Sequence, residues 1–219
     1  PITMTDSSLH TRQQLRRKFR DIRSNLPAEA KHQASDAICK HLHLLFAQSF
    51  LTRTAQAKTK RIAAYLNSEV EASLDTWITQ TWAQTQAQIF IPVVDQQPQQ
   101  GQMSFHRYTK NTLITVGRYG LRTLAQPQTT EQIDAADLDC VLLPRLAFDK
   151  YGTRLGMGGG YYDRFFAHDV NRPYLLGISF DAQRSAQKLE KSPWDVGLDA
   201  VITESGLTQF GTRELASGK

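Results

Sequence analysis

Cysteine is scarce in this sequence, since only Cys39 and Cys140 occur among 219 residues, far apart and in apolar surroundings. Without a CxxC pair or a histidine cluster at ligand spacing, neither a disulfide framework nor a zinc site is indicated. We expect both cysteines to be buried free thiols, a usage typical of a reducing compartment. Long apolar runs are also missing, because no stretch approaches the roughly 20 apolar residues of a membrane span. We therefore expect a cytoplasmic protein with no membrane partner.

Acidic residues are outnumbered, because 26 Lys and Arg against 21 Asp and Glu give a net charge of +5. The excess is local: residues 1–61 hold twelve basic and four acidic side chains, and the rest of the chain is slightly acidic. A basic segment permits a nucleic-acid-binding module, whose binding would depend steeply on salt. The sequence contains no recognised module of that kind. We expect no nucleic-acid partner and keep the module as an alternative.

The N-terminal part of the chain predicts two helices. Ser7 or Ser8 caps the first, whose apolar residues recur at intervals of three and four up to Leu26. Pro27 disfavours helical geometry in the residue before it and suits the first turn of the second helix. The apolar face of that second helix is formed by Ala34, Ile38, Leu42, Leu45 and Phe46.

From residue 60 onward, short apolar runs alternate with helical stretches. The expected strands are RIAAYL, IFIPVV, MSFHRY, LDCVLLP, PYLLGISF and LDAVIT, and the expected helices are SLDTWITQTWAQ and GGYYDRFFAH. Such alternation predicts an α/β fold: a three-layer, open, mainly parallel sheet with helices on both faces, preceded by two N-terminal helices. We expect one domain over residues 1–219, with flexible tails at about 1–8 and 206–219. A solvated loop at 95–102 and irregular structure up to about residue 135 complete the prediction.

Chemistry is concentrated in residues 142–164, where a strand leads through a turn into four glycines within five residues and then into a helix. Beyond a strand's carboxyl end, glycines let backbone N–H groups approach an anion closely, and phosphate is the natural candidate. The pattern GxGGG meets neither the dinucleotide fingerprint nor the P-loop. Arg154 could pair with phosphate oxygens, and Asp163 could hold Mg²⁺. The alternative is a tightly packed turn with Asp163 as a partner of the helix dipole.

Extended over LLPRLAFDKYGTRLGMGGGYYDRF, this segment resembles the signature of the 5-formyltetrahydrofolate cyclo-ligase family, also called 5,10-methenyltetrahydrofolate synthetases. Four further stretches are similar to the family's: RQQLR from Arg12, YLNSEVE from Tyr65, FIP from Phe90 and PWDVGLDAVIT from Pro193. The resemblance therefore covers residues from about 10 to 205, and the glycine segment is its most specific part.

The resemblance implies an enzyme, an ATP-dependent C–N ligase. Members of the family use MgATP to convert 5-formyltetrahydrofolate into 5,10-methenyltetrahydrofolate, with release of ADP and phosphate. The formyl oxygen would attack the γ-phosphate, N10 of the folate would add to the formyl carbon, and phosphate would leave. Such an enzyme aligns two substrates and neutralises the charge of the transferred group. The expected ligands are ATP, the folate and Mg²⁺, bound by a monomer.

The family's functional residues carry over to this chain position by position. For ATP the resemblance implies Arg12, Arg16, Arg154, Leu155, Gly156, Met157, Gly158, Gly159, Gly160, Tyr161 and Tyr162. For the folate it implies Leu66, Glu69, Met157, Gly159, Gly160 and Tyr161, with Glu69 on the N–H edge of the pterin. The implied catalytic residues are Arg154 and Tyr161, and the implied magnesium ligands are Asp163 and Asp195.

The sequence departs from the family's pattern in two places. Met157 and Gly159 stand where some relatives carry basic residues, so charge on the phosphates must be neutralised from elsewhere. Gln126 stands where the family usually has glutamate, and no function is assigned to it. For single residues, alternatives without a function in binding remain. Arg12 and Arg16 could form a solvated helix face, Glu69 could be a solvated carboxylate, and Tyr161 could pack in the core. A ligase of the same fold with another small substrate is a further alternative.

Overall fold

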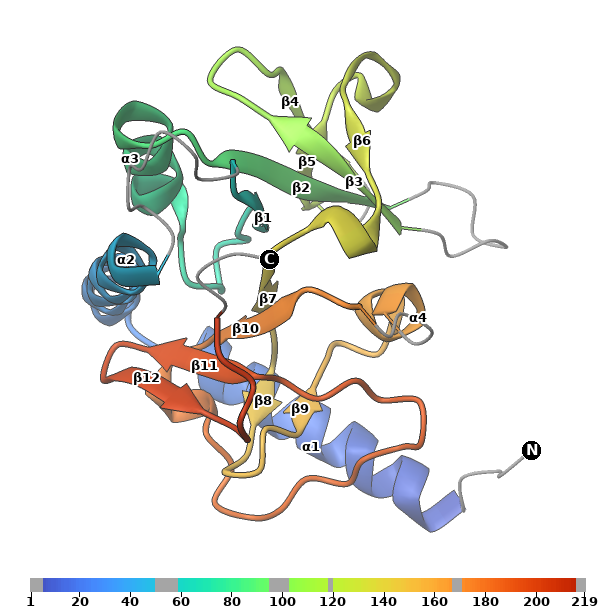
Figure 1. Cartoon of the computed structure of the whole chain (residues 1–219). Helices are drawn as coiled ribbons and strands as arrows, with labels where there is room; N and C mark the ends of the chain where they lie inside the picture. Colours follow the sequence, from blue (N-terminus) through green and yellow to red (C-terminus); the bar gives the residue numbers. More distant parts are fainter. Residues whose placement is uncertain (1–5, 50–58, 95–102, 118–119, 167–170, 216–219) are drawn as a thin grey trace.

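An eight-stranded sheet forms the centre of the structure, a computed structural model that describes residues 6–49, 59–94, 103–117, 120–166 and 171–215 (Figure 1). The strand order is β12–β11–β10–β7–β1–β2–β3–β6. The bounds are β1 Arg61–Ala63, β2 Gln88–Val94, β3 Met103–Tyr108, β6 Gln132–Ile133, β7 Cys140–Pro144, β10 Tyr174–Ile178, β11 Ala200–Thr203 and β12 Gly206–Gln209. The five central strands from β11 to β2 are parallel, and the pairs at both edges are antiparallel.

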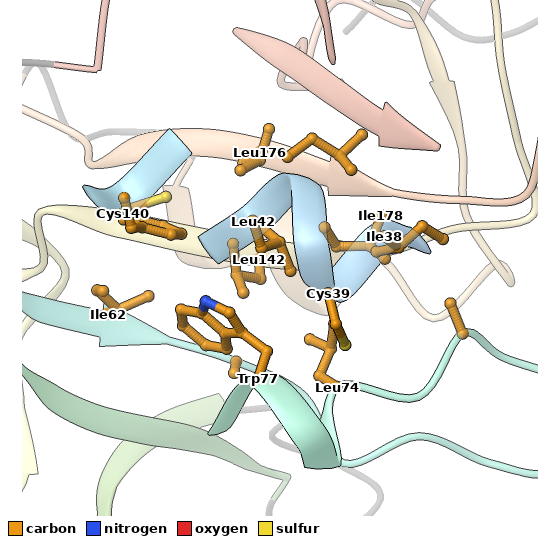
Figure 2. Packing of buried hydrophobic residues seen from close by; sticks show 14 of the residues in the cluster. Ile38, Cys39, Leu42, Ile62, Leu74, Trp77, Cys140, Leu142, Leu176 and Ile178 are labelled. Atoms are coloured by element: carbon orange, nitrogen blue, oxygen red, sulfur yellow. The ribbon is translucent and has the colours of Figure 1, made fainter. Parts of the chain in front are cut away.

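Helices cover both faces of this sheet, α2 (Ala28–Ser49) and α3 (Asp75–Gln84) on one side and α4 (Tyr161–Phe166) on the other (Figure 1). Alternate residues of the central strands belong to opposite clusters, so both faces of β7 and β10 are buried. Strands buried on both faces read as continuous apolar runs, which is why LDCVLLP and PYLLGISF were recognisable. Figure 2 shows the cluster under α2 and α3, which includes Ile38, Leu42, Ile62, Trp77, Leu142 and Leu176.

Helix α1 (Asp6–Ser24) packs instead against a small hairpin that follows β7 (Figure 1). This hairpin pairs β8 (Ala147–Phe148) with β9 (Arg154–Leu155). Phe19 of α1 lies with Leu146, Leu155 and Leu189 in a buried cluster. The glycine segment begins directly after β9, so this packing holds α1 beside it.

The structure confirms the predicted fold class, including the two N-terminal helices and the mainly parallel sheet. It corrects the stretch up to residue 135, which was expected to be irregular. That stretch contains the hairpin of β4 (Ile114–Val116) and β5 (Arg122–Leu124), and also β6. These strands have two or three residues and expose much of their surface, so no apolar period marks them in the sequence.

The ends of the chain also differ from expectation. The part of the expected tail from residue 206 to 209 forms β12, which a turn at Glu204 and Ser205 brings back antiparallel along β11. Helix α1 starts at Asp6, so Ser7 and Ser8 are positions inside its first turn and not its N-cap position. The glutamine-rich loop at 95–102 lies outside the described residues.

Cys39 and Cys140 are both buried and free, as predicted. Burial raises the pKa of each thiol, and that of Cys140 by far the more. Neither thiol is therefore poised as a nucleophile. None of the helices in the described part of the chain is long and apolar enough to cross a membrane.

Candidate active site

Residues from both ends of the chain meet at Arg12. Its Nη1 donates hydrogen bonds to Ser192 Oγ at 2.6 Å and to Asp195 Oδ2 at 2.9 Å. The same carboxylate oxygen accepts the backbone N–H of Ser192 at 2.8 Å. Arg12 is 7% exposed, and its Nε has no partner within the described residues. Arg12 is therefore a buried, ion-paired group and not part of a solvated basic face.

Arg16, one helical turn further along α1, contacts the glycine loop, which we define as residues 156–160. Its Nε donates to the carbonyl of Gly156 at 3.1 Å, and its guanidinium lies over Gly158. Burial and the neighbouring charge of Arg12 lower the pKa of Arg16. Two cations on one helix face thus lie together beside this loop.

The glycine loop needs glycine for conformational reasons at two of its positions. Gly158 has φ +108° and Gly160 has φ +62°, in the region that side chains with a Cβ rarely adopt. Gly159 is constrained by packing, because a Cβ there would lie 2.7 Å from the ring of Tyr161. Most of the loop is exposed, and the sulfur-bearing side chain of Met157 is 54% exposed. Among the described residues, the backbone N–H groups of this loop make no hydrogen bond, and an exposed loop of this kind beside two arginines suits an anionic ligand.

Asp163, in the first turn of α4, is fixed by two contacts. Its Oδ1 accepts hydrogen bonds from Nη2 of Arg154 and from the backbone N–H of Val196, the latter at 3.1 Å. Arg154 also donates through Nε to the carbonyl of Val196 at 2.9 Å. Because Val196 follows Asp195, these contacts bring the two predicted magnesium ligands to one place.

In the contacts described above, Asp163 and Asp195 each use only one of their two carboxylate oxygens. The hydrogen bonds of Asp163 go to Oδ1 and those of Asp195 go to Oδ2. Each keeps its second oxygen free of protein partners within the described part of the chain. No group of three or more His, Cys, Asp or Glu side chains able to hold a metal ion occurs among the described residues. The donor set therefore fits a cation that takes most of its ligands from phosphate and water, as Mg²⁺ does.

The segment after β1 supplies the other side of the site, and here Glu71 is more closely engaged than Glu69. Glu71 Oε2 accepts the backbone N–H and the hydroxyl of Ser68 at 2.9 and 2.8 Å, and Oε1 lies 3.5 Å from Nη1 of Arg23. The side chain of Glu69 is exposed, and its carbonyl accepts from Lys31 at 3.4 Å. Both glutamates line a pocket of about 350 Å³ with Ala28, Lys31, His32, Ser35, Asn67 and Ser73.

Arg23 was missed by the sequence interpretation. It lies on the same face of α1 as Arg12 and Arg16, at intervals of four and seven residues, and this spacing was the available signal. It is 3% exposed, and its Nη2 lies 3.8 Å from Sδ of Met157 in the glycine loop. Arg23 therefore contacts both Met157 of the glycine loop and Glu71 in the segment after β1.

Arg145 is a second buried cation that the sequence did not reveal. It follows β7, is 3% exposed, and donates through Nη2 to the carbonyl of Leu143. Its Nε and Nη1 have no partner in the described residues, and a Cβ at Gly177 would overlap the guanidinium. Burial, and then the charge of Arg154, lower the pKa of Arg145 to about 9. The phenols of Tyr65 and Tyr162 lie near enough to act on this charge.

Tyr161 and Leu66 are placed differently from each other. Tyr161 is half-buried, its ring lies under Gly159, and the guanidinium of Arg164 lies 5.2 Å from the ring centroid. Tyr161 therefore borders the glycine loop, although it also packs against the core cluster of α4. Leu66 is buried with Ile91 and Leu124, and it lies just before Glu69 and Glu71 in the chain. Tyr162, the next residue after Tyr161, is also half-buried against the core cluster of α4, and burial raises the pKa of its phenol.

Comparison with known proteins fits this geometry. Residues 8–204 match the sequence profile of the 5-formyltetrahydrofolate cyclo-ligase family. The chain belongs to this family. A 5-formyltetrahydrofolate cyclo-ligase of Haemophilus influenzae is 32% identical over 194 residues, covering 87% of this chain and 96% of that protein. One of Escherichia coli is 30% identical over 152 residues, covering 68% of this chain and 80% of that protein.

Solved structures of this family share the fold. An NMR structure of the Aquifex aeolicus 5,10-methenyltetrahydrofolate synthetase matches with a TM-score of 0.73 and 23% identity, covering 93% of this chain and 94% of that one. The corresponding synthetase of Mycoplasma pneumoniae matches with a TM-score of 0.67 and 22% identity, covering 88% and 98%. Family membership thus rests on the sequence profile, and these structures support the architecture.

Proposed function

We propose that this chain converts 5-formyltetrahydrofolate into 5,10-methenyltetrahydrofolate at the expense of ATP, with Mg²⁺ as cofactor, and releases ADP and phosphate. The observation that carries the proposal is the meeting of Arg12, Arg16, the glycine loop and the carboxylates of Asp163 and Asp195 at one place. A magnesium–triphosphate complex requires cations and backbone N–H donors for its phosphates and carboxylate oxygens for its metal ion, and this place offers all three. Two further suggestions accompany it, a monomer and a cytoplasmic location, the latter favoured by two buried thiols.

On the nucleotide side, we assign the phosphates of ATP to Arg12, Arg16 and the loop from Arg154 to Tyr162. Arg12 and Asp195 pair with each other in the structure, and Arg154 pairs with Asp163. A bound triphosphate would compete with the carboxylates for the arginines, and Mg²⁺ would compete with the arginines for the carboxylates. Without a ligand, each arginine and each carboxylate therefore has the other as its partner. When bound, Mg²⁺ would neutralise charge on the phosphates.

On the folate side, we assign the pterin to the pocket beside Leu66, Glu69 and Glu71. The pterin edge presents N–H donors, and this pocket is lined by carboxylates and by the amide oxygen of Asn67, which is buried without a partner in the described structure. The unpartnered Asn67 oxygen and the exposed carboxylate of Glu69 favour a ligand that donates hydrogen bonds. The glycine loop residues Met157, Gly159 and Gly160, and the ring of Tyr161, would close the site from the nucleotide side.

The residues of this chain would then serve a two-step reaction. The formyl oxygen attacks the γ-phosphorus, the bond to the bridging oxygen breaks, and ADP leaves with that electron pair. N10 next adds to the activated carbon, phosphate leaves with the carbon–oxygen pair, and the N10 proton is lost to phosphate. Arg154 and the loop N–H groups hold the phosphoryl oxygens in line, and Tyr161 excludes water from the activated carbon.

A direct assay tests the proposal. Purified protein is mixed with folinic acid, ATP and MgCl₂, and the absorbance of the methenyl product is followed with and without a chelator. We expect product only when folate, ATP and Mg²⁺ are all present. A folded protein, verified by circular dichroism, that forms no product under these conditions would contradict the proposed activity. Product formation insensitive to chelator would contradict the magnesium assignment alone.

A further inference from the structure

Arg23 joins the two sides of the proposed site, and nothing in the proposed function yet uses it. Its Nη1 lies 3.5 Å from Oε1 of Glu71, in the segment assigned to the folate. Its Nη2 lies 3.8 Å from Sδ of Met157, in the loop assigned to ATP. If ATP and the folate bind as assigned, a group transferred between them passes close to this guanidinium.

The bonds that Arg23 makes are weak for a buried cation. The 3.5 Å separation from Glu71 is long, because a charge-assisted N–H···O bond usually measures about 2.7–2.9 Å. The thioether of Met157 is a poor acceptor, and Nε has no partner within the described residues. A buried guanidinium with so little compensation lowers stability unless an anion satisfies it. Arg23 can therefore exchange its present contacts for phosphoryl oxygens at little cost.

The direction of α1 places Arg23 at the correct end of the triphosphate. Arg12 contacts Asp195, Arg16 contacts Gly156, and Arg23 contacts Glu71, in that order along one helix face. Eleven residues of helix span about 16 Å. A triphosphate that runs along this face from Arg12 past Arg16, with its terminal phosphate toward the assigned folate, reaches Arg23 with that phosphate.

We propose that Arg23 binds the phosphoryl group while it moves from ATP to the formyl oxygen. In this step the new bond joins the formyl oxygen to phosphorus, the bond to the ADP oxygen breaks, and no proton moves. The guanidinium donates to the phosphoryl oxygens, whose charge spreads in the transition state. The assignment rests on the proposed function and adds a catalytic residue to it.

Steady-state kinetics of Arg23→Gln and Arg23→Lys test the assignment. We expect Arg23→Gln to lower kcat by about 10²–10³-fold, the range for loss of one transition-state donor, while both KM values change less than about threefold. Arg23→Lys keeps the charge and should recover part of that loss. Arg17→Gln is the matched control, because Arg17 is exposed on the same helix, and its kinetics should equal those of wild type.

A binding measurement separates this assignment from a merely structural one. ADP with aluminium fluoride, in the presence of folinic acid, mimics the phosphoryl group in transfer. We expect Arg23→Gln to lose this binding at least tenfold while it binds ADP alone like wild type. Unchanged aluminium fluoride binding, or a defect confined to the KM of folate, would overturn the inference and leave Arg23 as a support for Glu71.

The proposed function and this inference fail in different ways. Wild type that turns over while a folded Arg23→Gln variant keeps kcat within threefold overturns the assignment of Arg23 and leaves the function standing. Wild type that makes no methenyl product overturns the proposed function, and the assignment of Arg23 falls with it.

Discussion

Replacement of Arg145 by methionine should stabilise the protein. Arg145 is 3% exposed, two of its guanidinium nitrogens have no partner among the described residues, and no carboxylate in that part of the chain forms an ion pair with it. Methionine has a similar length, no charge and enough flexibility to fill the space over Gly177. The exchange of a buried, uncompensated ion for a packed apolar side chain is favourable.

The size of the effect follows from the pKa. A fall from 12.5 to about 9 corresponds to about 5 kcal/mol against the charged side chain in the folded protein. Relaxation around the charge reduces that figure, so we expect the free energy of unfolding to rise by about 1–4 kcal/mol near neutral pH. Above about pH 9 the unfolded chain holds a proton that the folded protein has released, so wild-type stability rises with pH. The advantage of the variant should therefore shrink as the pH rises above about 9.

Urea denaturation at a series of pH values measures this difference. The matched control is Arg107→Met, because Arg107 also has a buried unpartnered Nη1 but is half-exposed and lies over the ring of Phe90. We expect no gain from that control. A variant at Arg145 that is no more stable than wild type would refute the reasoning, because it would mean that the guanidinium is compensated.

Three further predictions concern the proposed ligands. Asp163→Asn should fold but need much more Mg²⁺, and kcat measured across a Mg²⁺ titration checks this; normal dependence would remove Asp163 from the metal site. Glu69→Gln should raise the KM of folate more than that of ATP, and Glu71→Gln should do the same because both side chains line the pocket assigned to the pterin; a larger effect on the KM of ATP would mean that the folate binds elsewhere. Gly158→Ala should raise the KM of ATP at least tenfold, because φ +108° strains a Cβ by about 1–3 kcal/mol. Gly156→Ala, with open space and no positive φ, should leave it nearly unchanged.

The parts of the fold that could be predicted are those whose pattern is local. Central strands buried on both faces appear as apolar runs, and α2 shows its buried face in the spacing of Ile38, Leu42 and Phe46. The hairpin of β4 and β5 could not be predicted in this way. Val116 at the end of β4 and Leu113 directly before β4 are 69% and 68% exposed, so no burial pattern distinguishes the hairpin from a loop.

In the candidate site, too, the residues of one local segment could be predicted, and the residues with distant partners could not. The glycine loop and Asp163 lie within one segment, so their spacing carries the chemical signal. Arg23 has a visible position on its helix, but its partners Glu71 and Met157 come from segments 48 and 134 residues away. Arg145 occurs as a lone charge in an apolar run, and only the structure reveals that Gly177 leaves space for it. Contacts of that range depend on the packing of the whole sheet and cannot be read from spacing.

The contact between Arg12 and Ser192 spans 180 residues of sequence. During synthesis, α1 therefore leaves the ribosome long before the residues that complete its binding surface exist. The strands β1, β2, β7 and β10 are all made before that point, but the proposed nucleotide site is incomplete until Ser192 and Asp195 have been made. We therefore expect chains that end before Ser192 to lack the proposed nucleotide site.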